Sequence, residues 1–201
     1  VMLASHHNQM GNGFATMLPN SQTVFYPGGM FLFDDFATSN WLATLTYHEL
    51  SHIFQLNVKT SEFSKISKSV LGNNWINFFP LPVNLFPPVT IPFPIFSHPN
   101  IILPDFILEG NAVFNESRFG YGGRLYSGHY RGILYLLLKE SVIDDDRIMN
   151  NHLHFPFSRE KYIYGGYFYN WLVFTHGPEK AHQFFKFHTK RVRRITWPAG
   201  I

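Results

Sequence analysis

The first thirty residues alternate between short apolar runs and turn-forming clusters, a pattern typical of β structure. Residues 13–17 and 23–26 form two such runs on either side of the cluster Pro19-Asn20-Ser21. A cluster of this kind between two apolar runs favours a turn. We therefore expect a β-hairpin, preceded by a shorter apolar run at residues 1–5.

Apolar residues recur at helical spacing between residues 39 and 56, and Ser39 or Asn40 can cap the first turn. This helix carries apolar side chains on more than one side, so we expect it to be largely buried. Polar groups inside it then need partners, because an unpaired buried polar group costs on the order of a few kcal/mol.

Four further helices are predicted over residues 104–118, 127–140, 160–176 and 178–192. The first begins with proline and aspartate, residue types that helix N-termini prefer. The last two are separated by Gly177-Pro178. Strands come first and helices afterwards, an order that favours the α+β class. We treat residues 1–201 as a single domain, since this length is enough for one substantial core.

The segment 57–103 interrupts this order with a long irregular stretch that is rich in proline. More than half of the 13 prolines of the chain lie in it, and proline forbids a continuous helix or a central strand. The segment is nevertheless apolar. Two interpretations remain open: a loop packed against the body, or a lid or a lip beside a cleft that contacts a partner or a membrane surface.

The composition narrows the classes of protein. Charged residues make up 14% of the chain and aromatic residues 18%, which excludes intrinsic disorder. Cysteine is absent, so disulfide frameworks and thiol chemistry are excluded, and a metal would be held by His, Asp or Glu. No run reaches the roughly 18 apolar residues of a membrane-spanning helix. Because the chain begins with Val1, we expect it to be a piece of a longer protein.

The formal net charge of +3 is mild, and basic residues gather near the C-terminal end, at residues 186–194. Positive side chains are favoured at a helix C-terminus by the helix dipole. We therefore expect no nucleic-acid partner. A nucleic-acid arm and a contact with anionic lipid are the alternatives.

One string inside the predicted helix 39–56 carries recognisable chemistry: His48-Glu49-Leu50-Ser51-His52. Residues four apart lie on one face of a helix, so both imidazoles can bind one Zn²⁺. Glu49 can then act as a general base toward a water at the metal. The alternative is a pair of ordinary buried histidines with hydrogen-bond partners.

A catalytic zinc takes a third protein ligand and keeps one position open. Gln55 and Val58 stand where a metzincin has glycine and histidine, so that pattern is absent. Glu109 fits instead, because it is a carboxylate in an otherwise apolar predicted helix and needs a partner there. Glu116 lies seven residues further on the same face. It is either a support for a ligand or a surface glutamate.

The string at 48–52, followed by a helix that reads Glu109-Gly-Asn-Ala-Val-Phe-Asn-Glu116, resembles the gluzincin zinc peptidases of the peptidase MA-like superfamily. The closer likeness is to bacterial proteins that pair such a domain with a TolB-like β-propeller. It also includes residues 12–15, 122–124 and 164–168. The resemblance implies a zincin-like fold, peptide or protein substrates, a β-propeller of the same chain as partner, and a periplasmic or secreted location.

Position by position, the resemblance implies one catalytic Zn²⁺ held by His48, His52 and Glu109, with Glu49 as general base. The function it implies is hydrolysis of peptide bonds by a water activated at the metal. The departure from the family lies at position 113, where some gluzincins have an aspartate that orients a histidine and this chain has valine. The alternative function is therefore a catalytically inactive zincin-fold module that binds or scaffolds a partner.

Several further roles follow from the resemblance. Gly13, Phe14 and Ala15 resemble the strand edge that pairs with the substrate backbone, unless they form an ordinary hairpin strand. Tyr164 and Tyr167 are candidates for stabilising the oxyanion, with His129 behind them, unless they only pack in the core.

Because valine replaces the family's aspartate at position 113, the sequence does not show which group orients the metal-binding histidines. Either Glu116, Asn111 or another group orients a ligand in its place, or this support is weaker than in the family.

Overall fold

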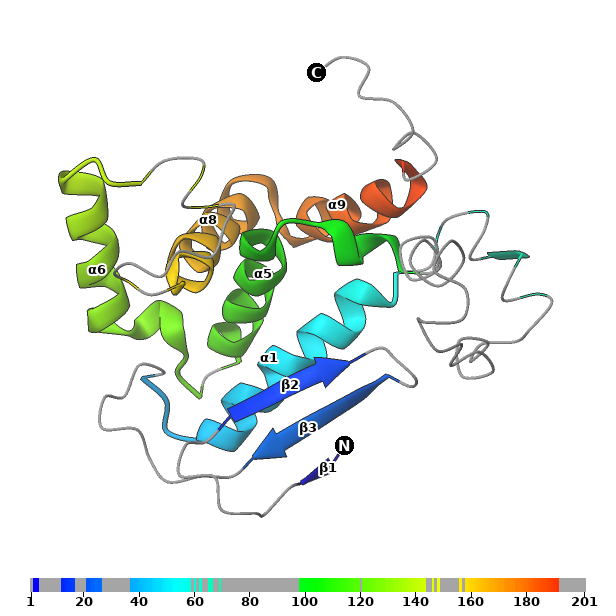
Figure 1. Ribbon diagram of the computed structural model, residues 1–201, viewed down its shortest axis with the longest axis horizontal. Coiled ribbons are helices and arrows are strands. Elements are labelled where there is room, and N and C mark those ends of the chain that lie inside the picture. The colour runs from blue at the N-terminus through cyan, green and yellow to red at the C-terminus, as the bar shows by residue number, and fades with distance from the viewer. Residues whose placement is uncertain are drawn as a thin grey trace, which may run out of the picture.

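In the computed structural model, a small sheet precedes five α-helices within the part of the chain that is described (Figure 1). The described residues are 2–3, 12–16, 21–26, 37–58, 60, 62, 65–66, 69, 98–119, 121–143, 146, 148, 156 and 158–191. The predicted α+β class is confirmed. Most of the segment 57–103 and the basic residues after 191 lie outside the described residues, and so do the predictions made for them.

The sheet is built around the predicted hairpin, which is confirmed. Strands β2 (Asn12–Thr16) and β3 (Gln22–Tyr26) pair in antiparallel fashion. Strand β1 (Met2–Leu3) pairs in parallel with β3, so the strand order is β1-β3-β2. Among the described strands β2 is therefore at an edge, and it lies over helix α1 (Trp41–Leu56) (Figure 1).

A glycine allows β2 to approach α1 closely. A Cβ atom on Gly13 would lie 3.0 Å from Cδ2 of Leu45 and 3.1 Å from Cδ1 of Phe25. Both of these neighbours are buried. Because successive side chains of a strand point to opposite faces, Phe14 points away from α1 and is 45% exposed.

Helix α1 begins as predicted. The Asn40 side chain caps it by accepting a hydrogen bond from the backbone N–H of Ala43. The prediction that it is largely buried is confirmed, since only Leu42 and Phe54 of its sixteen residues are exposed, at 43% and 71%. The buried residues are mostly polar, namely Thr44, Leu45, His48, Glu49, Ser51 and Gln55. These buried polar residues lie on the face of α1 that packs against helix α5 (Asp105–Arg118), where they need hydrogen-bond partners.

Helices α5 and α8 (Glu160–His176) cross at two glycines. A Cβ atom on Gly110 would lie 2.3 Å from the carbonyl oxygen of Gly165, so only glycine allows this approach. Glycine inside a helix costs about 1 kcal/mol relative to alanine, which the close packing of the two helices offsets. The crossing holds α5 firmly at the residue after Glu109.

Helices α6 (Gly128–Lys139) and α9 (Pro178–Arg191) complete the helical part, together with two short 3-10 turns, η2 (Pro99–Ile102) and η3 (Arg124–Tyr126). Two apolar clusters hold these helices. One contains Leu103, Ile107, Tyr169, Ala181 and Phe185. The other contains Tyr130, Ile133, Leu137 and Ile163. None of the described helices combines the length and the hydropathy needed to span a membrane.

Candidate metal centre

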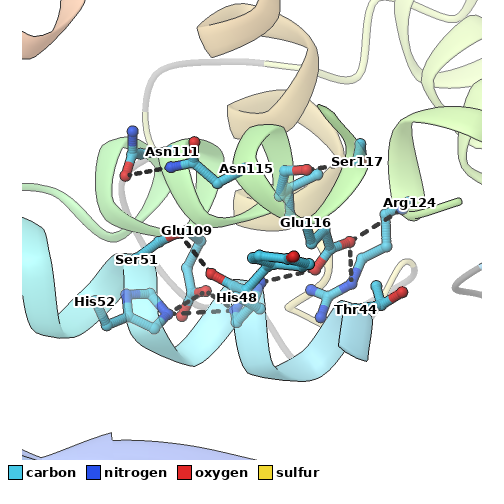
Figure 2. A network of polar contacts seen from close by, with 12 residues as sticks. Thr44, His48, Ser51, His52, Glu109, Asn111, Asn115, Glu116, Ser117 and Arg124 are labelled. Carbon is cyan, nitrogen blue, oxygen red and sulfur yellow. Dashed lines mark hydrogen bonds and ion pairs between the residues drawn. The ribbon is translucent and has the colours of Figure 1, made fainter. Parts of the chain in front are cut away.

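Three side chains from two helices meet between α1 and α5 (Figure 2). His48 and His52 project from α1, and Glu109 projects from α5. The Nε2 atoms of the two histidines are 3.2 Å apart. They lie 3.2 Å (His48) and 3.3 Å (His52) from Oε2 of Glu109. The structure thus brings together the three residues that the sequence predicted as metal ligands; we refer to them as the ligand cluster.

The spacing of these atoms fits a zinc ion. Ligand atoms at the corners of a regular tetrahedron with metal bonds of about 2.0–2.1 Å are about 3.3–3.4 Å apart. The observed separations of 3.2, 3.2 and 3.3 Å match one face of that tetrahedron. Two imidazoles and a carboxylate are also the donor set of one class of catalytic zinc site, in which the fourth corner is left for water or substrate.

The electrostatics of the ligand cluster favour a positive charge within it. Burial and the Arg124 cation act to lower the pKa of His48, but the carboxylates of Glu109 and Glu116 outweigh them and raise it to about 9. Burial acts to raise the pKa of Glu109, yet the imidazoles of His48 and His52 hold it well below its usual value. A cluster that stabilises a proton in this way also attracts a metal cation, which competes for the same atoms.

His48 is oriented from its other ring nitrogen by Glu116. Nδ1 of His48 donates a hydrogen bond to Oε2 of Glu116 at 2.8 Å, and Glu116 is fully buried. The interpretation of Glu116 as a surface residue is therefore wrong. A proton held on Nδ1 leaves the Nε2 lone pair free for a metal. Glu116 takes the orienting role that the sequence left open, while Val113 packs beneath Gly166.

Arg124 completes this support by pairing with Glu116. Its backbone N–H donates to Oε1 of Glu116 at 3.0 Å, and its Nε atom lies 3.3 Å from the same oxygen. Gly122 and Gly123 lead into it with φ angles of +98° and +132°, which glycine adopts readily. A Cβ atom on Gly123 would also lie 2.4 Å from Oγ of Ser117. The glycine pair is thus what brings Arg124 against Glu116.

His52 is held by neutral groups instead. The amide nitrogen of Gln55 lies 2.7 Å from Nδ1 of His52 and donates to the backbone carbonyl of Leu108 at 3.2 Å. The backbone carbonyl of Gln55 accepts a hydrogen bond from Nδ2 of Asn100 at 2.7 Å. Oδ1 of Asn100 lies 3.0 Å from Nδ1 of His188. Sequence reasoning missed this network, although the three-residue spacing of His52 and Gln55 signals a shared helix face.

Glu49 is buried next to the histidine that precedes it in the chain, at 4% exposure. Burial raises the pKa of its carboxyl group, and the imidazoles of His48 and His52 oppose that rise. A carboxylate shielded from bulk water beside both imidazoles can exchange a proton with a reactant at the ligand cluster.

The tyrosines of α8 take different positions. Tyr164 stacks on Phe168 of its own helix, and the hydroxyl of Tyr167 donates to the carbonyl of Leu125 at 3.3 Å. The contacts of these two predicted residues are therefore with the helical packing. Tyr162, which the sequence analysis did not select, has its ring centre 6.2 Å from that of His48.

Tyr162 also lies against Arg124, the residue that pairs with Glu116. The guanidinium carbon of Arg124 lies 4.6 Å from the centre of the Tyr162 ring, a distance at which a cation is attracted to the ring face. Burial and the Glu109 carboxylate raise the pKa of Tyr162 above its usual value. Its hydroxyl therefore stays protonated and can donate a hydrogen bond.

The other predicted residues lie apart from the ligand atoms. Asn111 accepts a hydrogen bond from Asn115 at 3.3 Å and points away from the histidines (Figure 2). The reason is helix geometry, since two residues beyond Glu109 is nearly the opposite face of α5. His129 is exposed on α6. Residues 13–15 form the middle of the edge strand β2.

A groove of about 550 Å³ lies on a neighbouring face of α1, between α1, α5, α8 and α9. Its lining includes Tyr47, Phe54, Phe114 and Arg118. None of the three ligand residues, nor Glu49, lines it. The groove and the ligand cluster are therefore separate features of the helix pair.

Comparisons of this chain with protein-family models, curated proteins and solved structures gave no match. The chemistry of the site is therefore inferred from its own atoms. These are three ligand atoms at zinc spacing, a buried carboxylate beside them and a tyrosine ring near one imidazole. Such a centre can bind a divalent cation and move a proton at the open side of the cation.

Proposed function

We propose that this chain is a zinc-dependent metallopeptidase domain of the gluzincin type. The observation that carries the proposal is the triangle of ligand atoms from His48, His52 and Glu109, with sides of 3.2–3.3 Å. Zinc bound there supplies Lewis-acid polarisation of the scissile carbonyl and lowers the pKa of water to about 7.

The protein's own groups move the protons. Glu49 accepts a proton from the water that attacks the scissile carbonyl carbon, and it delivers that proton to the nitrogen as the C–N bond breaks. The burial that raises the pKa of Glu49 suits a group that must both accept and release a proton near neutral pH. Tyr162, rather than Tyr164 or Tyr167, donates a hydrogen bond to the oxygen that becomes negative.

The sheet supports a peptide as the substrate. Strand β2 is the edge of the described sheet and lies over the helix that carries the histidines (Figure 1). An edge strand offers unpaired backbone N–H and C=O groups, and an extended peptide can pair with them. Gly13, Phe14 and Ala15 are the residues that we assign to this pairing; the Gly13 N–H donates to Oδ1 of Asn12 at 2.8 Å and would exchange that bond for one to the peptide.

The test compares wild type with Glu49→Gln, with Ser51→Ala as a matched control. Ser51 is a buried polar residue of the same helix whose hydroxyl donates only within α1, to the carbonyl of Tyr47. We expect one zinc per chain in all three proteins by elemental analysis. Cleavage of a peptide library should fall about 10²–10⁴-fold in Glu49→Gln and stay at the wild-type level in Ser51→Ala. A wild type that binds no zinc, or full activity in Glu49→Gln, would contradict the proposal.

The alternative function is a catalytically inactive zincin-fold module that keeps its metal and binds a partner. The observation in its favour is a set of large apolar side chains exposed on α6, α8 and α9: Tyr135, Leu138, Trp171, Phe174 and Phe187. This function predicts zinc binding without cleavage of any library peptide. Cleavage that a chelator abolishes and added zinc restores would exclude it.

A further inference from the structure

The groove between α1, α5, α8 and α9 has one polar wall, which α5 provides. Asn111, Asn115 and Arg118 line the groove and follow one another on α5 at intervals of four and three residues. This spacing places their side chains on one face of the helix. Asn111 and Asn115 lie on the side of α5 away from the histidines (Figure 2). Helix α5 therefore directs Glu109 to the ligand cluster and a second row of polar side chains to the groove.

The other walls of the groove are mostly apolar. Tyr47, Leu50 and Phe54 come from α1, and Ala181 and Phe185 come from α9. The Phe54 ring is 71% exposed, so it is available to contact a molecule that lies in the groove. The volume of about 550 Å³ is within the roughly 300–1,000 Å³ of pockets that bind small molecules, and such pockets are mostly apolar with a few polar groups.

Arg118 gives the groove a positive charge that is held between two aromatic rings. Its guanidinium carbon lies 5.5 Å from the centre of the Phe114 ring and 5.2 Å from that of the Phe119 ring, and both rings line the groove. At these distances a cation is attracted to the ring faces. Within the described part of the chain, Arg118 forms no ion pair. Its N–H groups can therefore bind a carboxylate through two parallel hydrogen bonds.

Glu179 is the acidic residue of the groove, and its charge is compensated elsewhere. It lies in the first turn of α9 and is exposed. A carboxylate is stabilised at a helix N-terminus by the helix dipole. No ion pair between Glu179 and Arg118 occurs among the described residues. Arg118 is therefore the charged group that selects a ligand by its sign.

We propose that this groove binds a small apolar carboxylate, with the carboxylate on Arg118 and the apolar body against the side chains of α1 and α9. The cation without a counter-ion selects the negative group, and the exposed ring of Phe54 selects the apolar body. None of the three predicted metal ligands lines the groove, so this binding goes beyond the proposed function and does not rest on it.

The first experiment measures the binding of 6-phenylhexanoate and of its uncharged amide to the full chain, by calorimetry at neutral pH with chelator present. The carboxylate should bind about 5–10-fold more tightly than the amide, because a charge-assisted hydrogen bond is roughly twice as strong as a neutral one. In Arg118→Gln the two compounds should bind equally. The control is Arg131→Gln, an exposed arginine of α6 outside the groove, which should keep the preference of the wild type.

A second pair of variants locates the apolar body. Phe54→Ala removes an exposed ring of the groove, so both compounds should bind about 2–10-fold more weakly while the preference for the carboxylate remains. The control is Phe174→Ala on α8, which removes a ring that is 90% exposed and lies outside the groove. It should bind both compounds as the wild type does. Both changes are at exposed positions, where substitutions alter stability little.

Three results would overturn the inference at its first step: no binding of 6-phenylhexanoate by the wild type, equal binding of the acid and the amide, or a preference for the acid that survives in Arg118→Gln. An equal loss in Phe54→Ala and Phe174→Ala would also overturn it, because the compounds would then bind to exposed apolar surface in general.

The same titration with acetyl-Leu-Leu-Phe tests the size of the ligand. If this peptide acid bound about tenfold more tightly than 6-phenylhexanoate, the assignment to a small molecule would be wrong. Because chelator is present throughout, the outcome is independent of zinc. A chain that binds no zinc would contradict the proposed function and leave this inference intact, and the loss of carboxylate binding would do the reverse.

Discussion

The two histidines of the ligand cluster differ in what holds their outer nitrogens. His48 donates to the carboxylate of Glu116, which is paired with the buried cation of Arg124. His52 faces the neutral amide of Gln55. A carboxylate can only accept, so it fixes the His48 proton on Nδ1 with or without a metal.

The comparison separates two tasks within one cluster. Mutating the Glu116–Arg124 pair beside His48 should cost much stability, because removing one member of a buried ion pair leaves the charge of the other uncompensated. Replacing the neutral Gln55 amide beside His52 removes no buried charge, so it costs less stability. We therefore expect changes on the His48 side to alter the stability of the fold, and changes on the His52 side to alter metal affinity.

The largest effect on stability is expected for Glu116→Ala. The variant leaves the Arg124 guanidinium buried without its carboxylate, which should lower the free energy of unfolding by about 3–5 kcal/mol. Urea denaturation with chelator present measures it. The control is Asp105→Ala on the same helix, whose carboxylate is about half exposed and pairs with Lys161 at 3.4 Å; a loss of at most about 1 kcal/mol is expected there. Similar losses in both variants would contradict the comparison.

A large effect on catalysis is expected for Tyr162→Phe, because Arg124 ties this ring to the charged side. Loss of one hydrogen-bond donor to an oxyanion lowers kcat about 10²–10³-fold, with zinc content unchanged. The controls are Tyr164→Phe and Tyr167→Phe: the Tyr164 ring stacks on Phe168, and the Tyr167 hydroxyl donates to the Leu125 carbonyl. If either control loses more activity than Tyr162→Phe, the assignment of the oxyanion group is wrong.

A smaller loss of stability is expected for Gly123→Ala, which changes no charge. Its φ of +132° and the 2.4 Å approach of the added Cβ to Ser117 both strain alanine, at a cost of about 1–3 kcal/mol. The control is Gly128→Ala, because a Cβ atom there would meet nothing within 4 Å. Thermal unfolding should separate the two. Equal melting temperatures for Gly123→Ala and Gly128→Ala would show that the glycines before Arg124 do not hold the Arg124–Glu116 pair in place.

What the sequence predicted well depends on local geometry. The spacing of His48 and His52 follows from the helical repeat, which any stable helix imposes. Glu109 was found because a lone carboxylate in an apolar helix needs a partner. The hairpin was found because a turn cluster separates two apolar runs.

What the sequence missed depends on how elements pack. Tyr162, Tyr164 and Tyr167 are equivalent to a sequence analysis, and the crossing of α5 and α8 at Gly110 and Gly165 decides which of them meets His48. The polar character of the buried face of α1 has the same origin. The partners of its buried polar residues lie on α5, far along the chain, so the sequence of the helix alone does not show them.

The last effect is a pH dependence of the metal-free protein that should disappear with zinc. The pKa of His48 is raised from 6.5 to about 9 in the folded chain, where the carboxylates of Glu109 and Glu116 outweigh burial. A raised pKa contributes stability that is complete below pH 6.5 and is lost as the pH rises through about 9.

We therefore expect the melting temperature of the chelator-treated protein to fall by about 6–12 °C between pH 6 and pH 9.5. Zinc displaces the proton from the ligand cluster, so this fall should vanish when the metal is bound. Glu116→Gln should reduce the fall, since one of the two carboxylates that raise the His48 pKa is neutralised, whereas Gln55→Met should leave it as large as in the wild type. Calorimetry at both pH values measures this fall. A fall that is unchanged in Glu116→Gln but abolished in Gln55→Met would contradict the comparison, because it would mean that Gln55, and not Glu116, sets the protonation of the cluster.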